Sequence, residues 1–414
     1  MEGRRIPTVE TGMKIVDLKC AVIAGYPVVR IDTDAGISGI AQIEFPKRSY
    51  IKPHVLFFKP TILGMNPTNV ERVRLKIRRF GAFKPWGSAV SAIEMALWDI
   101  AGKAAGLPVY RLLGGKIRDR VRVYCGGAGP PLTGYTPEDY AENARAKKAL
   151  PERFSIIKFP IGFHGRMFEA VSNYFYGEVE PRTEFAIPEN RGHLTERGLK
   201  HTVACVEAVK AVLGDEVGLA LDCGPGLSIP STLKLAKAVE PLNVAWLEDT
   251  ITGDYTPYTS VEAFRLVSSN TTTPIHTGEQ IYLRQGFKGL IDTNAVDIIG
   301  PDPCDVGGLA ELKWIAEFAD LYGVLIAPHG VFDGIIGRAA LVQVCATFPK
   351  NYIAFELPRI EPIWWDLVKG CPGLDVKDSC IDVSDRPGLG VELNEEVVRK
   401  HLPEGDDFLE SKGR

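Results

Sequence analysis

The sequence has little that would direct the chain to a membrane, to nucleic acid or to an oxidising compartment. It contains no run of 18 apolar residues, and its first residues lack the hydrophobic stretch of a signal peptide. The formal net charge is −4, so the basic surface typical of nucleic-acid-binding proteins is missing. Eight cysteines are scattered without a CxxC or Cys/His cluster, which is typical of reduced thiols. These absences predict a cytoplasmic globular protein that binds neither membranes nor nucleic acid.

Histidine is also sparse, and its distribution argues against one class of barrel enzyme. None of the seven histidines forms an HxH pair, the pattern of zinc hydrolase barrels. Hydrophobic residues make up 45% of the chain and charged residues 24%, as in a globular protein with a sizeable core. A length of 414 residues accommodates two domains, one of them a barrel of about 250 residues.

Residues 1–117 carry the pattern of an N-terminal α+β domain. Apolar and polar residues alternate over about residues 14–45, as they do in strands, and residues 34–36 are suited to a hairpin turn. Helical stretches are predicted to follow at about 53–63, 68–79 and 87–106. An antiparallel sheet followed by helices is the order expected of an α+β domain.

Strand and helix patterns alternate through residues 118–374. Eight apolar runs have the length of strands, at about 121–124, 155–160, 218–222, 244–248, 274–278, 295–299, 323–327 and 352–356. Eight parallel strands, each followed by a helix, close a (β/α)₈-type barrel, so the predicted fold class is α/β. The remaining residues, 375–414, contain a turn signal and one short strand, and we expect them to return to the first domain.

Polar residues with chemical potential follow six of these apolar runs. They are Asp222, Glu248, Glu279, Asp302, His329 and Glu356, and successive members lie 23 to 31 positions apart. A strand, a loop and a helix occupy about that much chain. At the C-terminal ends of barrel strands these side chains would converge on the mouth of the barrel, where such folds carry out their chemistry.

The first three of these residues, Asp222, Glu248 and Glu279, indicate a metal site. Each one alone could be a helix N-cap or a surface acid. On successive strands, however, three carboxylates would repel one another unless a cation lay among them. Oxygen ligands favour a hard divalent ion, and the predicted cofactor is Mg²⁺.

The remaining candidates suggest an acid/base site beside that metal. Asp302 next to His329 would fix the imidazole tautomer and raise its pKa, which suits a general base. Lys158 ends its strand near the predicted metal and is expected to stabilise an oxyanion, although a surface lysine is the alternative. For Glu356 a catalytic role competes with a helix-cap role.

Other features near these strands have weaker interpretations. Asp249 follows Glu248 and should point to the opposite side of the strand, which favours a structural role. His164 is a candidate for an additional acid. It lies in a segment rich in Gly, Pro and aromatic residues, 161–193, whose length favours either an active-site lid or an oligomer contact.

Taken together, these motifs resemble the enolase superfamily, and within it the mandelate racemase subgroup, over nearly the whole chain. The resemblance is carried by SAIEMALWDIAGKAAGLPVYRLLGG, by the acids on three consecutive strands, and by PDPCDVGG, APHG, FELP and DRPGLGVELN. It implies a capping domain whose loops, at about 44–50 and 80–86, close over the substrate. It also implies Mg²⁺ on the three acids, a His329–Asp302 acid/base dyad and a homo-oligomer.

The sequence departs from the racemases of that subgroup at one informative position. Those enzymes carry Lys-x-Lys on the second strand, with the second lysine acting as a base, whereas this chain has Lys158-Phe159-Pro160. Acid-sugar dehydratases of the subgroup, rhamnonate dehydratases among them, are similar in having Lys-x-Pro. Gly224 and Thr250 also differ from the residues that often follow the third-strand and fourth-strand acids.

The resemblance therefore implies a Mg²⁺-dependent dehydratase that converts a sugar acid, an aldonate or aldarate, into a 2-keto-3-deoxy acid. His329 would remove the proton next to the carboxylate, and Lys158 and Glu356 would stabilise the charge that develops. Two alternatives stay open. One is a racemase or epimerase of a 2-hydroxy acid that uses Lys158 as its second base. The other is a barrel that has lost activity and serves as a binding protein.

Overall fold

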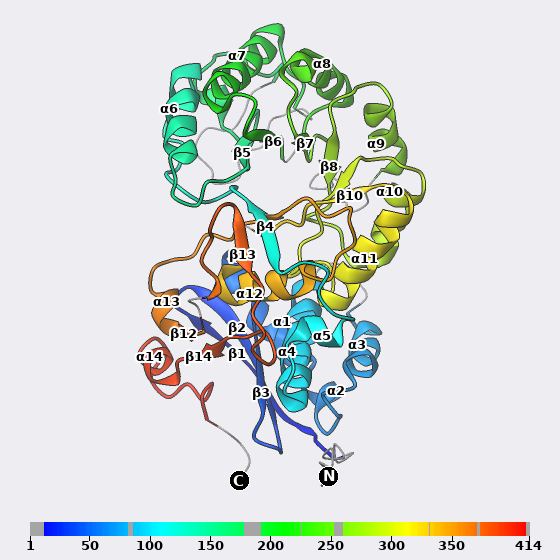
Figure 1. Cartoon of the computed structure of the whole chain (residues 1–414), viewed down its shortest axis with the longest axis vertical. Helices are drawn as coiled ribbons and strands as arrows, with labels where there is room; N and C mark the ends of the chain where they lie inside the picture. Colours follow the sequence, from blue (N-terminus) through cyan, green and yellow to red (C-terminus); the bar gives the residue numbers. More distant parts are fainter. Residues whose placement is uncertain are drawn as a thin grey trace, which may run out of the picture.

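A computed structural model describes residues 12–81, 86–177, 192–224, 226–251, 260–330, 332–370 and 373–410. Its chain forms two lobes, and the first and last described residues belong to the lower one (Figure 1). The lower lobe contains an antiparallel sheet in the order β1-β2-β3, built from Ile15–Ile23, Tyr26–Thr33 and Ser38–Gln42. Its helical elements are η1 (Phe45–Ser49), α1 (Ile51–Phe57), α2 (Lys59–Ile62), α3 (Val70–Arg78), α4 (Gly87–Ala105) and α5 (Val109–Leu112). The predicted N-terminal α+β domain is confirmed.

Helix α4 is the central support of this capping lobe. Most of its residues are buried, and it ends at Gly106, which adopts the left-handed conformation (φ 66°) that a glycine C-cap permits. The helix packs so closely on β3 that a Cβ at Gly39 would lie 2.0 Å from the carbonyl oxygen of Ala96. This close approach explains why a glycine occupies that strand position.

The upper lobe is a ring of parallel strands surrounded by helices (Figure 1). Six strands pair in the order β5 to β10: Ile156–Pro160, Gly218–Asp222, Trp246–Glu248, Ile275–Thr277, Ile298–Ile299 and Leu325–Ile326. β11 (Phe355–Glu356) pairs in parallel with β4 (Arg120–Tyr124). Parallel bridges from Cys125 to Ile157 and from Ile326 to Tyr352 link this pair to the other six. The predicted (β/α)₈ barrel is therefore confirmed, with eight parallel strands counted within the described residues.

Helices cover the outside of this ring, and the first four of them begin after a residue whose side chain caps the helix. They are α6 (Pro137–Lys148), α7 (Glu196–Leu213), α8 (Ile229–Val239), α9 (Val261–Ser268), α10 (Leu283–Asp292), α11 (Leu309–Leu321) and α12 (Gly334–Cys345). Thr136 forms a capping box with Asp139 at the start of α6, and Ser228 caps α8. Two short helical turns lie between these elements, η3 (Met167–Glu169) and η4 (Glu240–Leu242).

Buried polar contacts fix the capping lobe against the barrel. Glu94 in α4 accepts hydrogen bonds from the backbone N–H groups of Leu309 (2.7 Å) and Ala310 (2.9 Å) at the first turn of α11. Gly308 leaves room for this carboxyl group, because a Cβ there would lie 2.1 Å from Glu94 Oε2. Arg74 of α3 adds a buried ion pair with Glu311, at 2.6 Å. These contacts with α11 hold the capping lobe in a fixed position over the ends of the barrel strands.

The last elements run back along the capping lobe. They are α13 (Trp364–Leu367), β12 (Val368–Lys369), β13 (Cys380–Asp382), β14 (Glu392–Leu393) and α14 (Glu395–Arg399). The Leu389 N–H donates to Asp99 Oδ1 of α4 at 2.9 Å, and Glu395 pairs with Arg30 of β2 at 2.8 Å. Because β13 pairs antiparallel with β4 of the barrel, the segment ties the sheet and α4 to the barrel.

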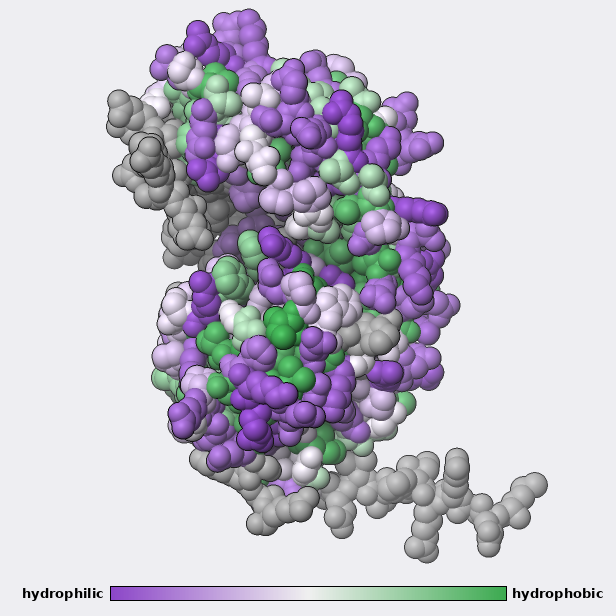
Figure 2. Space-filling view, turned by 90° about the vertical axis from the view of Figure 1, so that its left-hand side faces the viewer, coloured by the Kyte–Doolittle hydropathy of each residue, from purple (hydrophilic) through white to green (hydrophobic). Residues whose placement is uncertain are grey.

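Hydrophilic residues predominate on the molecular face drawn in Figure 2, with hydrophobic ones interspersed among them. Within the described ranges, no helix combines the length and hydrophobicity that a transmembrane span needs. Of the segment expected to be a lid or an oligomer contact, residues 178–191 lie outside the described residues.

Candidate active site

The barrel's parallel register brings the strand-end residues to one level. Asp222 pairs with Glu248 across β6 and β7, and Pro160 pairs with Asp222 across β5 and β6. Glu279 follows β8 by two residues, after the backbone turns at Gly278 (φ 137°). The side chains of Asp222 and Glu248 are buried, and that of Glu279 is 23% exposed. Three carboxylates from consecutive strands therefore stand at the same end of the barrel.

Lys158 is the centre of one half of this site. Its Nζ lies 2.7 Å from Glu248 Oε1, 3.2 Å from Asp222 Oδ2 and 3.1 Å from Glu356 Oε1. Although burial opposes its charge, Glu248 and Glu356 hold the pKa of Lys158 well above its ordinary value. The alternative of a surface lysine is therefore wrong, because this ammonium group is a buried fixed charge.

His329 is the centre of the other half. Its Nδ1 lies 2.6 Å from Asp302 Oδ2, while its Nε2 lies 3.3 Å from Glu279 Oε2 and 3.5 Å from Glu356 Oε2. The Cys304 N–H donates to Asp302 Oδ1 at 2.6 Å and thereby orients the carboxylate. Burial lowers the pKa of His329, but Glu279 and the bond to Asp302 outweigh it and raise that pKa well above 6.5. The dyad expected from sequence is thus brought together.

Glu356 joins the two halves, because it contacts both Lys158 and His329. Its carboxyl group fits only because residue 126 is glycine, since a Cβ there would lie 1.6 Å from Glu356 Oε1. Tyr124 OH lies 3.5 Å from the other carboxyl oxygen. Glu356 is buried inside the site, so the helix-cap alternative does not describe it.

The donor set at the ends of β6, β7 and β8 fits a hard divalent cation. Asp222, Glu248 and Glu279 supply carboxylate oxygens, the ligands that Mg²⁺ prefers. Burial raises the pKa of Glu279 to about 7, with a further contribution from Asp222. Burial together with Glu279 and Glu248 also raises the pKa of Asp249 well above its ordinary value. The buried carboxyl groups here outnumber the one buried lysine beside them. Their negative charge would be balanced by an additional cation.

Asp249 lies closer to these acids than strand alternation predicts. Its backbone is left-handed (φ 50°), which interrupts the alternation directly after Glu248. Thr277 Oγ1 donates to Asp249 Oδ1 at 2.6 Å, and a Cβ at Gly224 would lie 3.9 Å from the Cβ of Asp249. The residue is therefore a buried neighbour of the three acids predicted to bind metal, and it is held by a hydrogen bond from β8.

The position of a second racemase base is occupied by an apolar residue. Pro160 ends β5 two positions after Lys158, on the same strand face. Nearby, His164 Nε2 lies 3.9 Å from Asp222 Oδ2, and about half of its side-chain surface is exposed. Burial raises the pKa of Asp222, but His164 and Lys158 outweigh it and keep that pKa below its usual range.

Two buried acids near the dyad were not among the predicted site residues. Glu44 comes from the end of β3 in the capping lobe, and an oxygen of its carboxyl group lies within 4.8 Å of a ring nitrogen of His329 and an oxygen of Asp302. Burial raises the pKa of Glu44 to about 7 against the opposing charge of Lys47. Asp333, four residues after His329, is fully buried. Glu44 is the first residue of the cap loop predicted at about 44–50, and this was the only feature of the sequence that placed it near the substrate.

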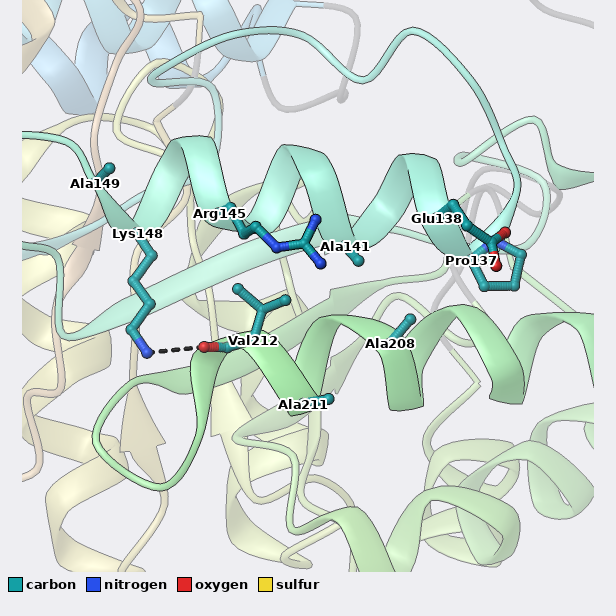
Figure 3. A pocket seen from close by; sticks show the side chains of 9 residues that line it. All are labelled: Pro137, Glu138, Ala141, Arg145, Lys148, Ala149, Ala208, Ala211 and Val212. Atoms are coloured by element: carbon teal, nitrogen blue, oxygen red, sulfur yellow. Dashed lines mark hydrogen bonds between the residues drawn. The ribbon is translucent and has the colours of Figure 1, made fainter.

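A surface groove lies away from these residues. It has a volume of about 820 Å³ and runs between α6 and α7 on the outside of the barrel (Figure 3). Alanines line much of it, and Lys148 points to the end of α7, where it donates to the carbonyl oxygen of Val212 at 2.8 Å. This lysine completes a helix C-terminus, so the groove is explained by helix packing.

Comparison with known families agrees with the fold and the motifs. Residues 12–114 match the N-terminal domain of mandelate racemase / muconate lactonizing enzyme, and residues 141–397 match the enolase C-terminal domain-like family. A mandelate racemase/muconate lactonizing enzyme-like protein from Rubrobacter xylanophilus superposes with a TM-score of 0.79. It is 32% identical, and the match covers 96% of this chain and 100% of that one.

Curated relatives of similar length carry the names of sugar-acid dehydratases. A D-xylonate dehydratase from Haloferax volcanii is 32% identical over 407 residues, covering 96% of this chain and 91% of its own. A D-mannonate dehydratase from Caulobacter vibrioides is 30% identical, covering 94% and 95%. The resemblance inferred from the motifs is confirmed: the chain belongs to the mandelate racemase/muconate lactonizing enzyme family of the enolase superfamily.

Proposed function

We propose that this protein is a dehydratase of a sugar acid, an aldonate or aldarate, which it converts to the 2-keto-3-deoxy acid. The observation that carries the proposal is the arrangement of His329, bonded to Asp302, beside the buried group formed by Lys158 and Glu356. The names of the full-length relatives support the same reaction class.

The first difficulty of this reaction is the weak acidity of the proton next to a carboxylate. Its removal creates a second negative charge, which must be stabilised in a site that excludes water. Asp222, Glu248 and Glu279 would hold a Mg²⁺ ion, which supplies Lewis-acid stabilisation of the substrate carboxylate when bound. Lys158 would add its fixed positive charge at the same carboxylate.

The proton is assigned to His329. With Nδ1 bonded to Asp302, Nε2 is the nitrogen that would accept the proton. Its unprotonated state would be favoured by a cation on Glu279, because the charge of that carboxylate raises the pKa of His329. Once protonated, the same nitrogen can donate to the departing 3-hydroxyl group, so that one residue serves first as base and then as acid. This requires the proton and the hydroxyl group to leave from the same face of the substrate.

The replacement of the second lysine by Pro160 supports dehydration over racemisation. Racemisation needs a proton acceptor on each face of the α-carbon, and proline has no titratable group. The rival function is a racemase or epimerase with Lys158 as second base. Against it stand the three carboxylates that pair with Lys158 and favour its protonated form.

A screen of aldonates and aldarates for 2-keto acid formation in the presence of Mg²⁺ tests the proposal. D-Xylonate, D-galactonate and D-mannonate are the first substrates to include, given the relatives' names. Dehydration predicts a 2-keto product, and it predicts that His329→Asn abolishes turnover while substrate still binds. Exchange of the α-proton with solvent deuterium without loss of water would instead favour the racemase.

A further inference from the structure

Asp333 stands at the start of α12, yet it does not cap that helix. An aspartate in this position normally accepts a hydrogen bond from the backbone N–H three residues later. Here the Ile336 N–H donates instead to Gln42 Oε1 of the capping lobe, at 3.0 Å. The carboxyl group of Asp333 is fully buried, and within the described residues neither of its oxygens accepts a hydrogen bond from an N–H or O–H group, the Cys304 thiol beside it being only a weak donor. Gln42 of the capping lobe therefore caps α12 in place of Asp333.

The carboxyl group faces the catalytic dyad rather than the solvent. An oxygen of Asp333, an oxygen of Asp302 and the sulfur of Cys304 all lie within 4.8 Å of one another. Two glycines make room for it. A Cβ at Gly330 would lie 3.2 Å from Asp333 Oδ2, and a Cβ at Gly337 would lie 2.4 Å from the Cβ of Asp333. The chain therefore accommodates a second carboxyl group directly beside the one that orients His329.

The surroundings cannot support two full negative charges. No lysine or arginine forms an ion pair with Asp333 among the residues that the structure describes. Burial raises the pKa of Asp333 well above its usual value, and Asp302 and Glu44 raise it further. His329 and Cys304 act in the opposite direction and are outweighed. Like charges a few ångströms apart in a dry site are avoided by protonating one of them.

We propose that Asp333 is a positioning residue of the dyad, a carboxyl group that keeps its proton so that the Asp302–Asp333 pair carries one negative charge. This inference rests on the proposed function only for the role of the dyad, not for the proton itself. With one charge on the pair, Asp302 remains the single anion that holds the Nδ1–H group of His329. A protonated Asp333 can also donate to Asp302 and limit its rotation.

Infrared difference spectroscopy of the metal-loaded protein tests the proton directly. A protonated carboxyl group has a carbonyl stretch distinct from that of a carboxylate, and it shifts on exchange into D₂O. The wild-type protein should show such a band near neutral pH that is missing from Asp333→Asn. The matched control is Asp320→Asn on the exposed face of α11, which should retain the band.

An unchanged spectrum in Asp333→Asn would overturn the proposal. A divalent ion shared by Asp302, Cys304 and Asp333 would overturn it as well. That ion would appear as one equivalent of metal per chain that Asp333→Asn loses while Asp320→Asn keeps it. Neither the infrared band nor the metal stoichiometry depends on turnover. If the protein showed no dehydratase activity, the proposed function would be wrong, and this test of Asp333 would still be valid.

Kinetics test the connection to the dyad. Asp333→Ala should lower kcat by roughly 10- to 100-fold with little change in KM, as is typical when a residue that orients a functional group is removed. Asp333→Asn, which can still donate a hydrogen bond, should recover most of that loss. Wild-type enzyme should also show an alkaline ionisation in its kcat profile that Asp333→Asn lacks. Equal kcat and equal pH profiles for all three proteins would show that Asp333 does not act through Asp302.

Discussion

The two halves of the site are built in different ways. The half around Lys158 is made by barrel strands alone, because Asp222 on β6 and Glu248 on β7 lie in register and Lys158 stands two residues before the end of β5. The half around His329 is completed from elsewhere in the chain, with Glu44 contributed by the turn between β3 and η1 and Asp333 by the start of α12. The half around Lys158 therefore depends on strand register alone, whereas the half around His329 also depends on how the cap and α12 pack against the barrel.

The sharpest way to separate the two halves is His329→Asn. Loss of the base should lower kcat by at least about 10²–10⁴-fold, the usual contribution of a general base, while Mg²⁺ affinity changes little. Steady-state kinetics and calorimetry on the same preparation measure both. His401→Asn, at an exposed position, is the matched control and should leave kcat unaltered. Comparable turnover by His329→Asn would remove this residue from the mechanism.

Lys158→Met tests the other half through stability. The change leaves Asp222, Glu248 and Glu356 without their shared cation, and breaking a buried ion pair costs roughly 3–5 kcal/mol. Chemical denaturation should show that loss in the metal-free protein, and added Mg²⁺ should restore part of it. Lys237→Met on the exposed side of α8 should have no such effect. A stability equal to wild type would contradict the assignment of Lys158 as a buried charge.

Gly126→Ala tests the link between the halves. The added methyl group would overlap Glu356 Oε1 and displace this carboxyl group from both Lys158 and His329. We expect kcat to fall by roughly 10²-fold, since small displacements of catalytic groups have effects of that size. Gly373→Ala is the control, because a Cβ there meets nothing within 4 Å. If both variants match wild type, Glu356 has no role that requires its position.

The smallest expected effect concerns the cap. Burial raises the pKa of Glu44 from 4.5 to about 7, so folding favours its protonated form. That contribution to stability is complete below pH 4.5 and is lost as the pH rises through 7. Glu44→Gln should remove this loss, which is on the order of 1–3 kcal/mol. Urea denaturation between pH 4 and 8 measures it, with the exposed Glu404→Gln as control. Parallel curves for wild type and Glu44→Gln would contradict the raised pKa.

The positions of the residues at the ends of the barrel strands could be predicted from the sequence, for a physical reason. In a parallel barrel the position of a residue along its strand determines its place at the mouth, so Asp222 and Glu248 can be located from spacing alone. Helix α11 at Leu309–Leu321 can be recognised from the sequence for a similar reason, because its apolar face is periodic.

The remaining contacts depend on tertiary packing that spacing does not encode. Glu44 reaches His329 only because α4 fixes the cap on the barrel through Glu94. Asp249 lies near the three acids predicted to bind metal because its backbone is left-handed. The local sequence does not predict that conformation for an aspartate. Asp333 looks like an ordinary N-cap until Gln42 is seen to occupy the helix N-terminus.

The most direct test of the account is a crystal structure of His329→Asn with Mg²⁺ and a sugar acid that the wild-type enzyme consumes. The account predicts one ion bound by Asp222, Glu248 and Glu279, with the substrate carboxylate on that ion and near Lys158, and the α-carbon facing residue 329. Acids that bind no shared ion, or a substrate whose α-carbon faces Pro160, would contradict it.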